Sequence, residues 1–319
     1  MSARVVVTDY TFPSLEQEQA AAQAAGAEFA AHQCRTADEV AAVVAGADVA
    51  LVQFAPFGAR AAAALKTGAT VIRYGVGYDN IDLAAAKASG LKVGYVPDYC
   101  ADEVAEHTVS AALAMLRRLP SLDASVRSGA WTAAKVCRPM KPFADTVFGF
   151  FGLGQIGRAV LARLGGFGFK LIASDPVLSA AGADALGVRL VATDELLRQA
   201  DVICLHAPAT PETVGFFNAE RLATMQPHAV IVNSARGQLI REDDLADALN
   251  RGVIGGAALD VFNVEPLPAE SPLRSAPNLL LTPHAAWYSD AAIHRLQGLV
   301  ADDVSRALRG EGPRKPVKM

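Results

Sequence analysis

The 319-residue sequence predicts an α/β protein made of two units, each a parallel sheet with crossover helices. Three observations lead to this fold class. Short apolar segments alternate with helical segments along most of the chain, an irregular segment near 120–145 interrupts the alternation, and a glycine-rich turn opens the second run. The length suggests two domains and is enough to bury a full core.

The first run begins with the short β-branched segment "VVVTD" and the alanine-rich helical segment "SLEQEQAAAQAA", where Ser14 and Gln17 are spaced as a capping box. Thr36 and Glu39 repeat this device in "TADEVAAVVAG". Further short strands follow at "DVALVQF", "TVIRYG" and "LKVGYVP", with helices between them near 58–67 and from Asn80. This rhythm is typical of strands joined by crossover helices.

The second run follows a long amphipathic helix predicted over 101–119 and the irregular segment. It starts at "TVFGFFGLG" and continues to "NLLLTPH", where the last predicted strand ends. A helix over roughly 290–309 closes the chain. Long helices therefore stand at both joins between the two units.

Composition narrows the class of function. The net charge of −4 and the pI near 5.9 leave no basic face, so we expect no nucleic-acid partner. The four cysteines are scattered, and none has the spacing of a metal or redox site. The N-terminus enters a strand at once and no apolar run reaches membrane-spanning length, so we expect a cytoplasmic protein without a membrane partner.

A dinucleotide-binding turn is predicted in "FGFFGLGQIGRAV". Gly152, Gly154 and Gly157 form G-x-G-x-x-G between an apolar strand and a helix, where the backbone must approach a pyrophosphate closely. The next strand ends in Asp175, the position at which such folds place an acid on the adenosine ribose. Asp175 could instead be a turn former before Pro176. The combined pattern favours NAD, since a carboxylate repels the 2′-phosphate of NADP.

Candidate catalytic residues follow three later strands. Arg236 comes after "AVIVNS", Asp260 and Glu265 follow "GGAAL", and His284 follows "NLLL". Ligands of open α/β sheets bind at the carboxyl ends of the strands. There an arginine can hold a carboxylate, and a histidine can transfer protons beside an acid that orients it. Singly, each residue could be a surface ion pair or a loop residue; together they favour an active site.

The motifs "FGLGQIG" with Asp175, "NSARG", "ALDVFNVEP" and "TPHAAW" resemble those of the D-2-hydroxyacid dehydrogenase family. "RYGVGYDNID" and "ADEVAEHTV" resemble it too, and "TPHAAWYS" is most similar to the C-terminal-binding-protein branch. The resemblance implies two doubly wound domains. A flavodoxin-like substrate domain would comprise residues 1–100 and 286–319, and a Rossmann cofactor domain residues 101–285. It also implies a homodimer joined through the long helix and the segment 120–145.

The resemblance also assigns residues to roles. Arg236 would clamp the substrate carboxylate and carbonyl, and His284 would be the acid/base with Glu265 as its partner. The backbone of Val76 and Gly77 would meet the substrate. The implied NAD contacts are Gly152, Gly154, Gln155, Ile156, Gly157, Asp175, His206, Pro208, Thr213, Ala235, Arg236, Asp260, which would touch the nicotinamide carboxamide, and Thr108.

These assignments imply hydride transfer between NAD(H) and a 2-oxo or D-2-hydroxy acid. Phe54 and Trp287 are candidates for covering the substrate side chain, although Trp287 could equally pack between the domains. No arginine stands between Gln53 and Ala59, where relatives that handle phosphorylated substrates resemble one another in having them, so we expect an unphosphorylated substrate with an apolar or aromatic side chain. Alternatives are an NAD-sensing corepressor or scaffold and phosphite oxidation.

Overall fold

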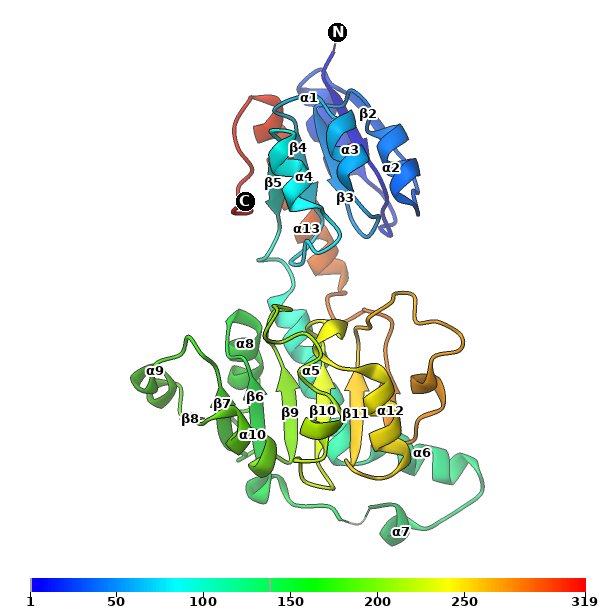
Figure 1. The fold of residues 1–319 in the computed structure, drawn as a ribbon, viewed down its shortest axis with the longest axis vertical. Coiled ribbons are helices and arrows are strands. Elements are labelled where there is room, and N and C mark those ends of the chain that lie inside the picture. The colour runs from blue at the N-terminus through cyan, green and yellow to red at the C-terminus, as the bar shows by residue number, and fades with distance from the viewer. Residues whose placement is uncertain (1, 138) are drawn as a thin grey trace. The chain divides into compact units, whose positions relative to one another are not determined.

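The computed structural model describes residues 2–137 and 139–319 and divides the chain into two compact units (Figure 1). The first unit comprises Met1–Cys100 and Ser289–Met319, and the second comprises Ala101–Tyr288. The chain therefore crosses between the units twice. The second crossing lies at Ser289 in the structure, whereas the sequence analysis placed it at residue 286.

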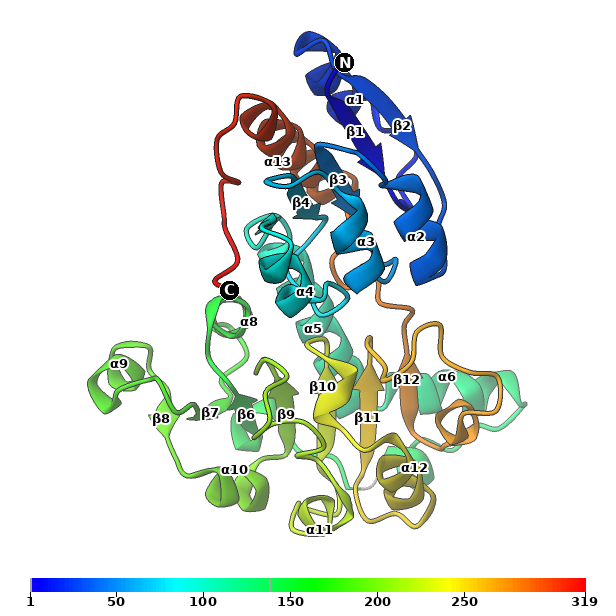
Figure 2. The ribbon, with the colours of Figure 1, turned by 45° about the horizontal axis from the view of Figure 1, so that its top comes forward.

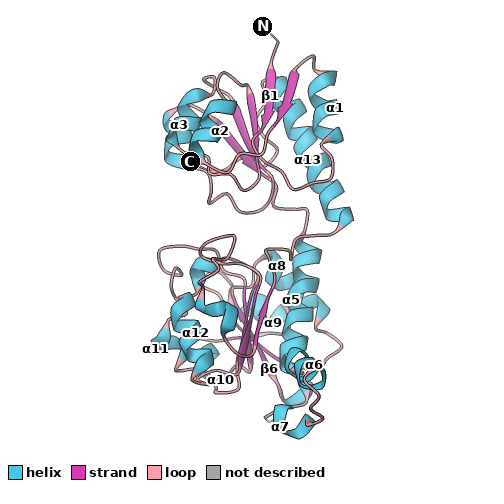
Figure 3. Cartoon of the chain, turned by 90° about the vertical axis from the view of Figure 1, so that its right-hand side faces the viewer, coloured by secondary structure: helices cyan, strands magenta, loops and turns pink. Residues whose placement is uncertain are grey.

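A five-stranded parallel sheet forms the centre of the first unit, in the order β2-β1-β3-β4-β5. This is the strand order of flavodoxin-like sheets. The strands are β1 (Arg4–Val7), β2 (Glu28–Ala31), β3 (Val49–Val52), β4 (Thr70–Arg73) and β5 (Lys92–Tyr95). The helices are α1 (Glu16–Ala24), α2 (Ala37–Val43), α3 (Ala59–Ala64), α4 (Leu83–Ala88) and α13 (Asp290–Leu308). Figure 3 shows α1 and α13 on one face of this sheet and α2 and α3 on the other.

The two predicted capping boxes have different outcomes. At α2 the prediction is confirmed, since the Thr36 side chain accepts from Glu39 N–H and the Glu39 carboxylate accepts from Thr36 N–H. At α1 it is wrong: the helix begins after Leu15 without a side-chain cap. Tertiary contacts prevail there, because Gln17 Nε2 donates to His294 O of α13 at 3.3 Å.

A seven-stranded parallel sheet forms the second unit, in the order β12-β11-β10-β9-β6-β7-β8 (Figure 2). Counted from β6, this is the 3-2-1-4-5-6 order of dinucleotide-binding sheets with one further strand. The strands are β6 (Val147–Phe151), β7 (Lys170–Ser174), β8 (Arg189–Leu190), β9 (Val202–Leu205), β10 (Val230–Asn233), β11 (Gly256–Leu259) and β12 (Leu279–Leu281). Two doubly wound sheets are thus confirmed.

Helices cover both faces of this sheet (Figure 3). They are α5 (Ala101–Leu116), α6 (Leu119–Arg127), α7 (Ala133–Cys137), α8 (Gln155–Arg163), α9 (Ala180–Ala185), α10 (Thr193–Gln199), α11 (Ala219–Leu222) and α12 (Glu242–Asn250), with 3₁₀ turns η1 (Phe143–Asp145), η2 (Gly237–Leu239) and η3 (Pro272–Ser275). Strand residues alternate between two buried cores: Ile203 and Ile231 pack with α10–α12, and Phe150 and Val232 pack with α5 and α8. In the described residues no helix could cross a membrane.

The segment near 120–145 is less irregular than predicted, because it contains α6, α7 and η1. Its return to the sheet is held by Asp201, which is 2% exposed and precedes β9. Lys141 Nζ donates to Asp201 Oδ1 at 2.8 Å, and Val147 N–H donates to Oδ2 at 2.8 Å. The segment is therefore tied to the amino-terminal edge of the sheet, opposite the strand ends that carry the predicted chemistry.

Candidate active site

The predicted catalytic residues follow three neighbouring strands of the second unit. Arg236 follows β10, Glu265 follows β11 and His284 follows β12, and these strands are adjacent in the sheet. Because the strands are parallel, their carboxyl ends lie at one edge. The three side chains and Asp260 therefore belong to one set of turns within one unit.

His284 and Glu265 form a close hydrogen-bonded pair, as predicted from the resemblance. His284 Nδ1 lies 2.6 Å from Glu265 Oε2, and the two side chains are 33% and 31% exposed. Glu265 Oε1 accepts from Phe262 N–H at 2.9 Å, which fixes the carboxylate. Burial alone raises the pKa of Glu265, but the His284 hydrogen bond, that backbone N–H and the charge of Arg236 hold it below its usual range. Glu265 is therefore ionised at neutral pH.

Arg236 lies on a turn that its neighbours define. Asn233 at the end of β10 accepts from Ala235 N–H through Oδ1 at 3.0 Å and donates to Arg236 O at 2.9 Å. Arg236 Nη1 donates to Ala235 O at 2.7 Å. Gly237 is required here, since a Cβ would lie 2.0 Å from the carbonyl carbon of Phe262. The Arg236 turn can therefore pack directly against the turn that carries Glu265.

Asp260 holds the His284 turn from inside the protein. It is 2% exposed, and its Oδ1 accepts from the Thr282 hydroxyl at 2.6 Å and from Ala285 N–H at 2.8 Å. Its Oδ2 accepts from Ala286 N–H at 2.9 Å, and its carbonyl accepts from His284 N–H at 2.8 Å. His284 has φ of +52°, a left-handed conformation that is uncommon outside glycine. The predicted nicotinamide contact of Asp260 stays a prediction.

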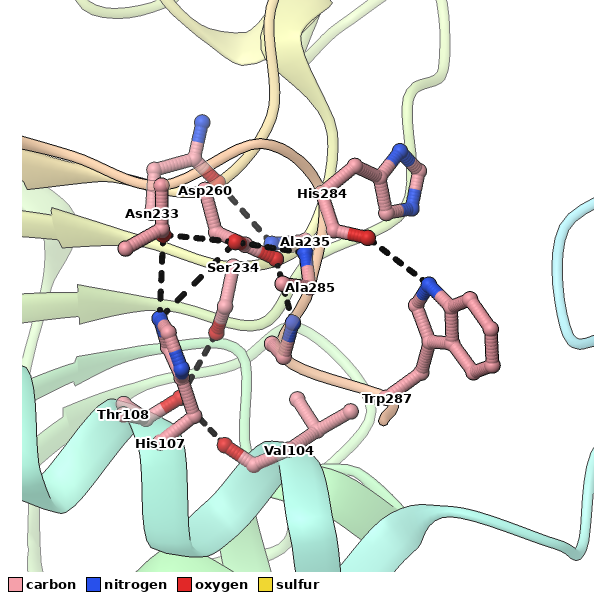
Figure 4. A network of polar contacts seen from close by, with 12 residues as sticks. Val104, His107, Thr108, Asn233, Ser234, Ala235, Asp260, His284, Ala285 and Trp287 are labelled. Atoms are coloured by element: carbon pink, nitrogen blue, oxygen red, sulfur yellow. Dashed lines mark hydrogen bonds and ion pairs between the residues drawn. The ribbon is translucent and has the colours of Figure 1, made fainter. Parts of the chain in front are cut away.

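Trp287, three positions after His284, also contacts the His284 turn. Its indole Nε1 donates to His284 O at 2.7 Å, as Figure 4 shows. The ring lies edge-on to Tyr288, with centroids 5.7 Å apart. The indole N–H therefore holds the backbone of His284 in place. Whether the ring also covers the substrate side chain stays a prediction.

The glycine-rich turn between β6 and α8 has the shape that a dinucleotide requires. Gly152 has φ of +88°, and a Cβ there would lie 2.9 Å from Ala207 N. A Cβ on Gly157 would lie 3.0 Å from Gly152 O. A Cβ on Gly154, in contrast, would meet no protein atom within 4 Å. The protein itself does not need glycine at 154, whereas close approach of a pyrophosphate does.

Asp175 follows β7 and is bonded to the same turn. Oδ2 accepts from Leu153 N–H at 2.7 Å, and Oδ1 accepts from Val177 N–H and Leu178 N–H at 2.8 and 3.0 Å. Burial raises its pKa, but these three donors outweigh burial and hold it below the usual range. The contacts are consistent with both interpretations of Asp175. It forms the turn before Pro176, and it is an ionised acid beside the glycine-rich turn.

The loop after β9, which carries His206 and Pro208, packs against the glycine-rich turn. A Cβ on Gly157 would come within 3.5 Å of the His206 ring. Burial lowers the pKa of His206 to about 4, and its Nε2 has no hydrogen-bond partner among the described residues. Thr213 closes the loop, since its hydroxyl donates to Pro208 O at 2.6 Å. His206 is therefore neutral at physiological pH.

The remaining predicted cofactor residues lie at the same edge with different exposure. Gln155 and Ile156 form the first turn of α8, and Ala235 lies on the Arg236 turn. Thr108 on α5 is fully buried, with its hydroxyl bonded to Val104 O and Ser234 Oγ. The predicted contacts of these residues with NAD stay predictions.

The predicted substrate residues Phe54, Val76 and Gly77 lie in the first unit, after β3 and β4. Phe54 is 42% exposed, and its N–H is held by the Asp9 carboxylate at 2.5 Å. Gln53 is 2% exposed and turns inward, where its Oε1 accepts from Thr11 N–H at 2.7 Å.

One cation near Phe54 was missed from the sequence. The guanidinium of Arg73, at the end of β4, lies 5.8 Å from the centre of the Phe54 ring. The sequence search considered only the loop after β3. The neighbouring strand β4 supplies this arginine, and its pairing with β3 is a tertiary feature.

Comparison with known proteins identifies the family of this arrangement. Residues 109–286 match the model of the D-isomer specific 2-hydroxyacid dehydrogenase NAD binding domain. The chain is 36% identical over 247 residues to glyoxylate reductase of Korarchaeum cryptofilum, a match that covers 76% of this chain and 74% of that enzyme. It is 40% identical over 275 residues to D-3-phosphoglycerate dehydrogenase of Mycobacterium tuberculosis, covering 86% of this chain and 52% of that protein.

Solved structures agree with this comparison. The TT0316 protein from Thermus thermophilus is 31% identical, with a TM-score of 0.86 over 99% of this chain and 100% of that one. D-lactate dehydrogenase from Aquifex aeolicus, complexed with NAD and lactic acid, is 26% identical, with a TM-score of 0.84 over 96% of each chain. The chain spans only about half the length of the phosphoglycerate dehydrogenases that it matches, 52% for the mycobacterial one.

Proposed function

Because the chain belongs to the D-isomer specific 2-hydroxyacid dehydrogenase family, we propose that it is an NAD-dependent enzyme interconverting a 2-oxo acid and its D-2-hydroxy acid. One observation carries the proposal: His284 and Glu265 are paired at 2.6 Å, close enough to Arg236 for its charge to affect the pKa of Glu265. A proton donor, the acid that orients it and a carboxylate-binding cation are the groups that this reaction needs.

The residues divide the work of reduction between them. Arg236 binds the carboxylate of the 2-oxo acid and stabilises the charge that develops on the carbonyl oxygen. His284 delivers a proton to that oxygen from Nε2, since Nδ1 is hydrogen-bonded to Glu265. Glu265 is ionised and orients the ring through this hydrogen bond. When bound, the nicotinamide cofactor supplies the hydride. The glycine turn, the α8 N-terminus and Asp175 are the groups that would hold it.

The comparison of His284 with His206 supports this choice of proton donor. Both histidines follow strands of the cofactor unit, and either could be the acid by position alone. Burial lowers the pKa of His206 to about 4, so its ring carries no extra proton at neutral pH. His284 has a carboxylate partner and His206 has no hydrogen-bond partner at Nε2 among the residues described. The proton therefore belongs on His284.

A kinetic test separates chemistry from cofactor binding. His284→Ala should lose about 10²–10⁴-fold in kcat, the range of general acid–base catalysis. NADH binding, followed by fluorescence titration, should be kept, because the imidazole acts on the substrate. His294→Ala, an exposed histidine on α13, is the matched control and should behave as wild type. Near-normal turnover by His284→Ala contradicts the assignment.

For the substrate, we propose an unphosphorylated 2-oxo acid with an apolar or aromatic side chain. The exposed Phe54 ring supports this, as does Gln53, whose side chain is buried in the fold. Arg73 and the 40% identical phosphoglycerate dehydrogenases favour a second candidate, a phosphorylated 2-oxo acid. Rates with pyruvate, glyoxylate, phenylpyruvate and phosphohydroxypyruvate, each with NADH and NADPH, decide between them. Preference for the phosphorylated acid, lost in Arg73→Gln, selects the second candidate.

A homodimer is proposed through α5 and the segment 120–145. Apolar side chains are exposed there on the described surface: Leu119 is 55%, Val126 54% and Trp131 88% exposed. An exposed tryptophan is costly in water and is enriched at protein interfaces. Light scattering during gel filtration should give a dimer mass for wild type and a monomer mass for Trp131→Glu. A wild-type monomer at micromolar concentration contradicts this assembly.

A further inference from the structure

Two neighbouring residues of α5, His107 and Thr108, contact two different catalytic turns (Figure 4). His107 Nε2 lies 3.1 Å from Thr282 Oγ1, and Thr108 Oγ1 lies 2.6 Å from Ser234 Oγ. Thr282 stands two positions before His284, and Ser234 stands two positions before Arg236. Adjacent residues of α5 therefore contact both catalytic turns, in each case two positions before the proposed catalytic residue.

The direction of these hydrogen bonds follows from counting protons. The Thr282 hydroxyl has one proton and donates it to Asp260 Oδ1 at 2.6 Å, so it accepts from His107 Nε2–H. The Thr108 hydroxyl donates to Val104 O at 2.8 Å, so it accepts from Ser234. Each series of hydrogen bonds thus ends on a group of one of the two turns, and an apolar side chain at either α5 position removes one hydrogen bond from its partner.

Helix and sheet geometry explain how adjacent residues serve separate turns. Successive side chains of an α-helix project about 100° apart. The two turns follow β12 and β10, which lie on either side of β11 in the sheet. With strands about 4.8 Å apart, the turns are separated by roughly 10 Å. The helix α5 packs against β10 and β11, and from it His107 reaches the turn after β12 and Thr108 the turn after β10.

The His107 chain continues to the backbone of the proposed proton donor. His107 is 26% exposed and lies 3.8 Å from Asp260 Oδ1, the carboxylate that also binds Ala285 N–H and Ala286 N–H. The hydrogen bonds of Thr108, which is fully buried, end on Ser234, next to Ala235, whose carbonyl accepts from the Arg236 guanidinium. The two contacts differ in the residue whose turn they support: the His107 contact supports the turn of His284, and the Thr108 contact supports the turn of Arg236.

We propose that His107 and Thr108 are positioning residues, His107 for the turn of His284 and Thr108 for the turn of Arg236. The inference rests on the proposed function of those two residues. It assigns them distinguishable effects on the same reaction: His107 acts through proton transfer, which enters kcat, whereas Thr108 acts through Arg236, whose carboxylate binding enters KM and whose stabilisation of the developing charge enters kcat.

The test uses apolar variants of matched shape and conservative variants that keep the hydrogen bond. His107→Leu should lower kcat for the best 2-oxo acid and leave its KM nearly unchanged. Thr108→Val should raise that KM and lower kcat less than His107→Leu does, because Arg236 binds the carboxylate as well as stabilising the developing charge. Each effect should be about two- to twelvefold, the range for one hydrogen bond between neutral groups. His107→Gln and Thr108→Ser keep a donor and a hydroxyl, and should restore most of the loss.

Controls separate positioning from loss of fold. Ser110→Ala removes an exposed hydroxyl from the same helix and should change neither constant. If an α5 variant fails to fold, the partner variants Thr282→Val and Ser234→Ala probe the same bonds, and should reproduce the kcat effect and the KM effect respectively. Equal changes of kcat and KM in both apolar variants, or no recovery in the conservative ones, overturn the proposal.

An activity-independent readout distinguishes failure of this inference from failure of the proposed function. NMR of the imidazole and guanidinium groups should show His284 signals shifted by His107→Leu and Arg236 signals shifted by Thr108→Val. A wild-type protein that reduces no 2-oxo acid refutes the proposed function, while these shifts still test the positioning. Unshifted signals in both variants overturn the positioning even when turnover is present.

Discussion

Asp260→Asn is the substitution that best tests how the site is held together. The two carboxylate oxygens accept from the Thr282 hydroxyl and from the N–H groups of Ala285 and Ala286. An asparagine places an NH₂ donor where one oxygen was, so in either orientation a donor faces a donor. The variant therefore loses at least one hydrogen bond to a charged, buried acceptor and gains a repulsive contact.

The size of the effect follows from these contacts. A hydrogen bond to a charged group contributes about 1.5–3 kcal/mol. The same turn keeps His284 at φ +52°, a conformation that costs free energy when its support is removed. If the turn must return to this geometry in each turnover, kcat falls by about 10- to 150-fold, at 1.36 kcal/mol per factor of ten.

The assay is steady-state reduction of a 2-oxo acid, with the Kd of NADH measured separately. Asp201→Asn is the matched control: Asp201 is equally buried at 2% exposure and also accepts a backbone N–H, but at the opposite edge of the sheet. It should lower Tm without lowering kcat. A kcat within about twofold of wild type for Asp260→Asn refutes the reasoning. A change confined to NADH affinity refutes it too, and favours the predicted nicotinamide contact.

Three other perturbations test the proton donor, the cofactor choice and the aromatic ring. Glu265→Gln removes a carboxylate whose pKa is held below its usual range despite burial, because of His284 and Arg236. The folded state lowers the pKa of Glu265, so its pairing with His284 is lost only as the pH falls through this lowered pKa. Wild type should therefore stay active well into acid pH. The variant has no carboxyl group to titrate at this position, so the acid limb of the pH–rate profile should be lost; an unchanged profile argues against the pairing. Asp175→Asn keeps an acceptor for the glycine turn but drops the charge, so the NADPH to NADH ratio of kcat/KM should rise; wild type preferring NADPH contradicts the assigned role. Trp287→Phe keeps a ring and loses the N–H, so it should lower kcat similarly for all substrates. Trp287→Ala should also lose about 5- to 150-fold in kcat/KM for bulky 2-oxo acids relative to glyoxylate, from roughly 1–3 kcal/mol of ring burial. Equal losses across substrates in Trp287→Ala would mean that the residue acts only through its hydrogen bond.

The fold was predictable because its signals are local. Short apolar segments alternating with helices, and the glycine turn at 152–157, are each read within a few residues. The same locality located Arg236, Glu265 and His284, since a polar residue just past a buried strand faces the carboxyl edge of a parallel sheet. The capping box at α2 was found for the same reason, because both partners lie three residues apart.

The supporting contacts were not predictable because they depend on which strands and helices are neighbours. "AEHTV" was noted for its resemblance, yet nothing in it says that His107 meets Thr282 across 175 positions. Asp260 was read as a cofactor contact, and only the register of β11 and β12 shows its carboxylate bonded to the His284 turn. Gly237 similarly needs to be glycine only because Phe262 approaches it from the turn after β11.

The distribution of residues between the units bears on how substrates are selected. His284, Glu265 and Arg236, the proposed proton donor, its acid and the proposed carboxylate-binding cation, lie in Ala101–Tyr288, on turns held by Asp260 and by α5. Phe54 lies in the other unit, on a loop held by Asp9. A change in the ring at 54 leaves every hydrogen bond of the catalytic turns intact. Replacing Phe54, the predicted cover of the substrate side chain, with smaller residues is therefore expected to move substrate preference while the pH–rate profile stays that of wild type.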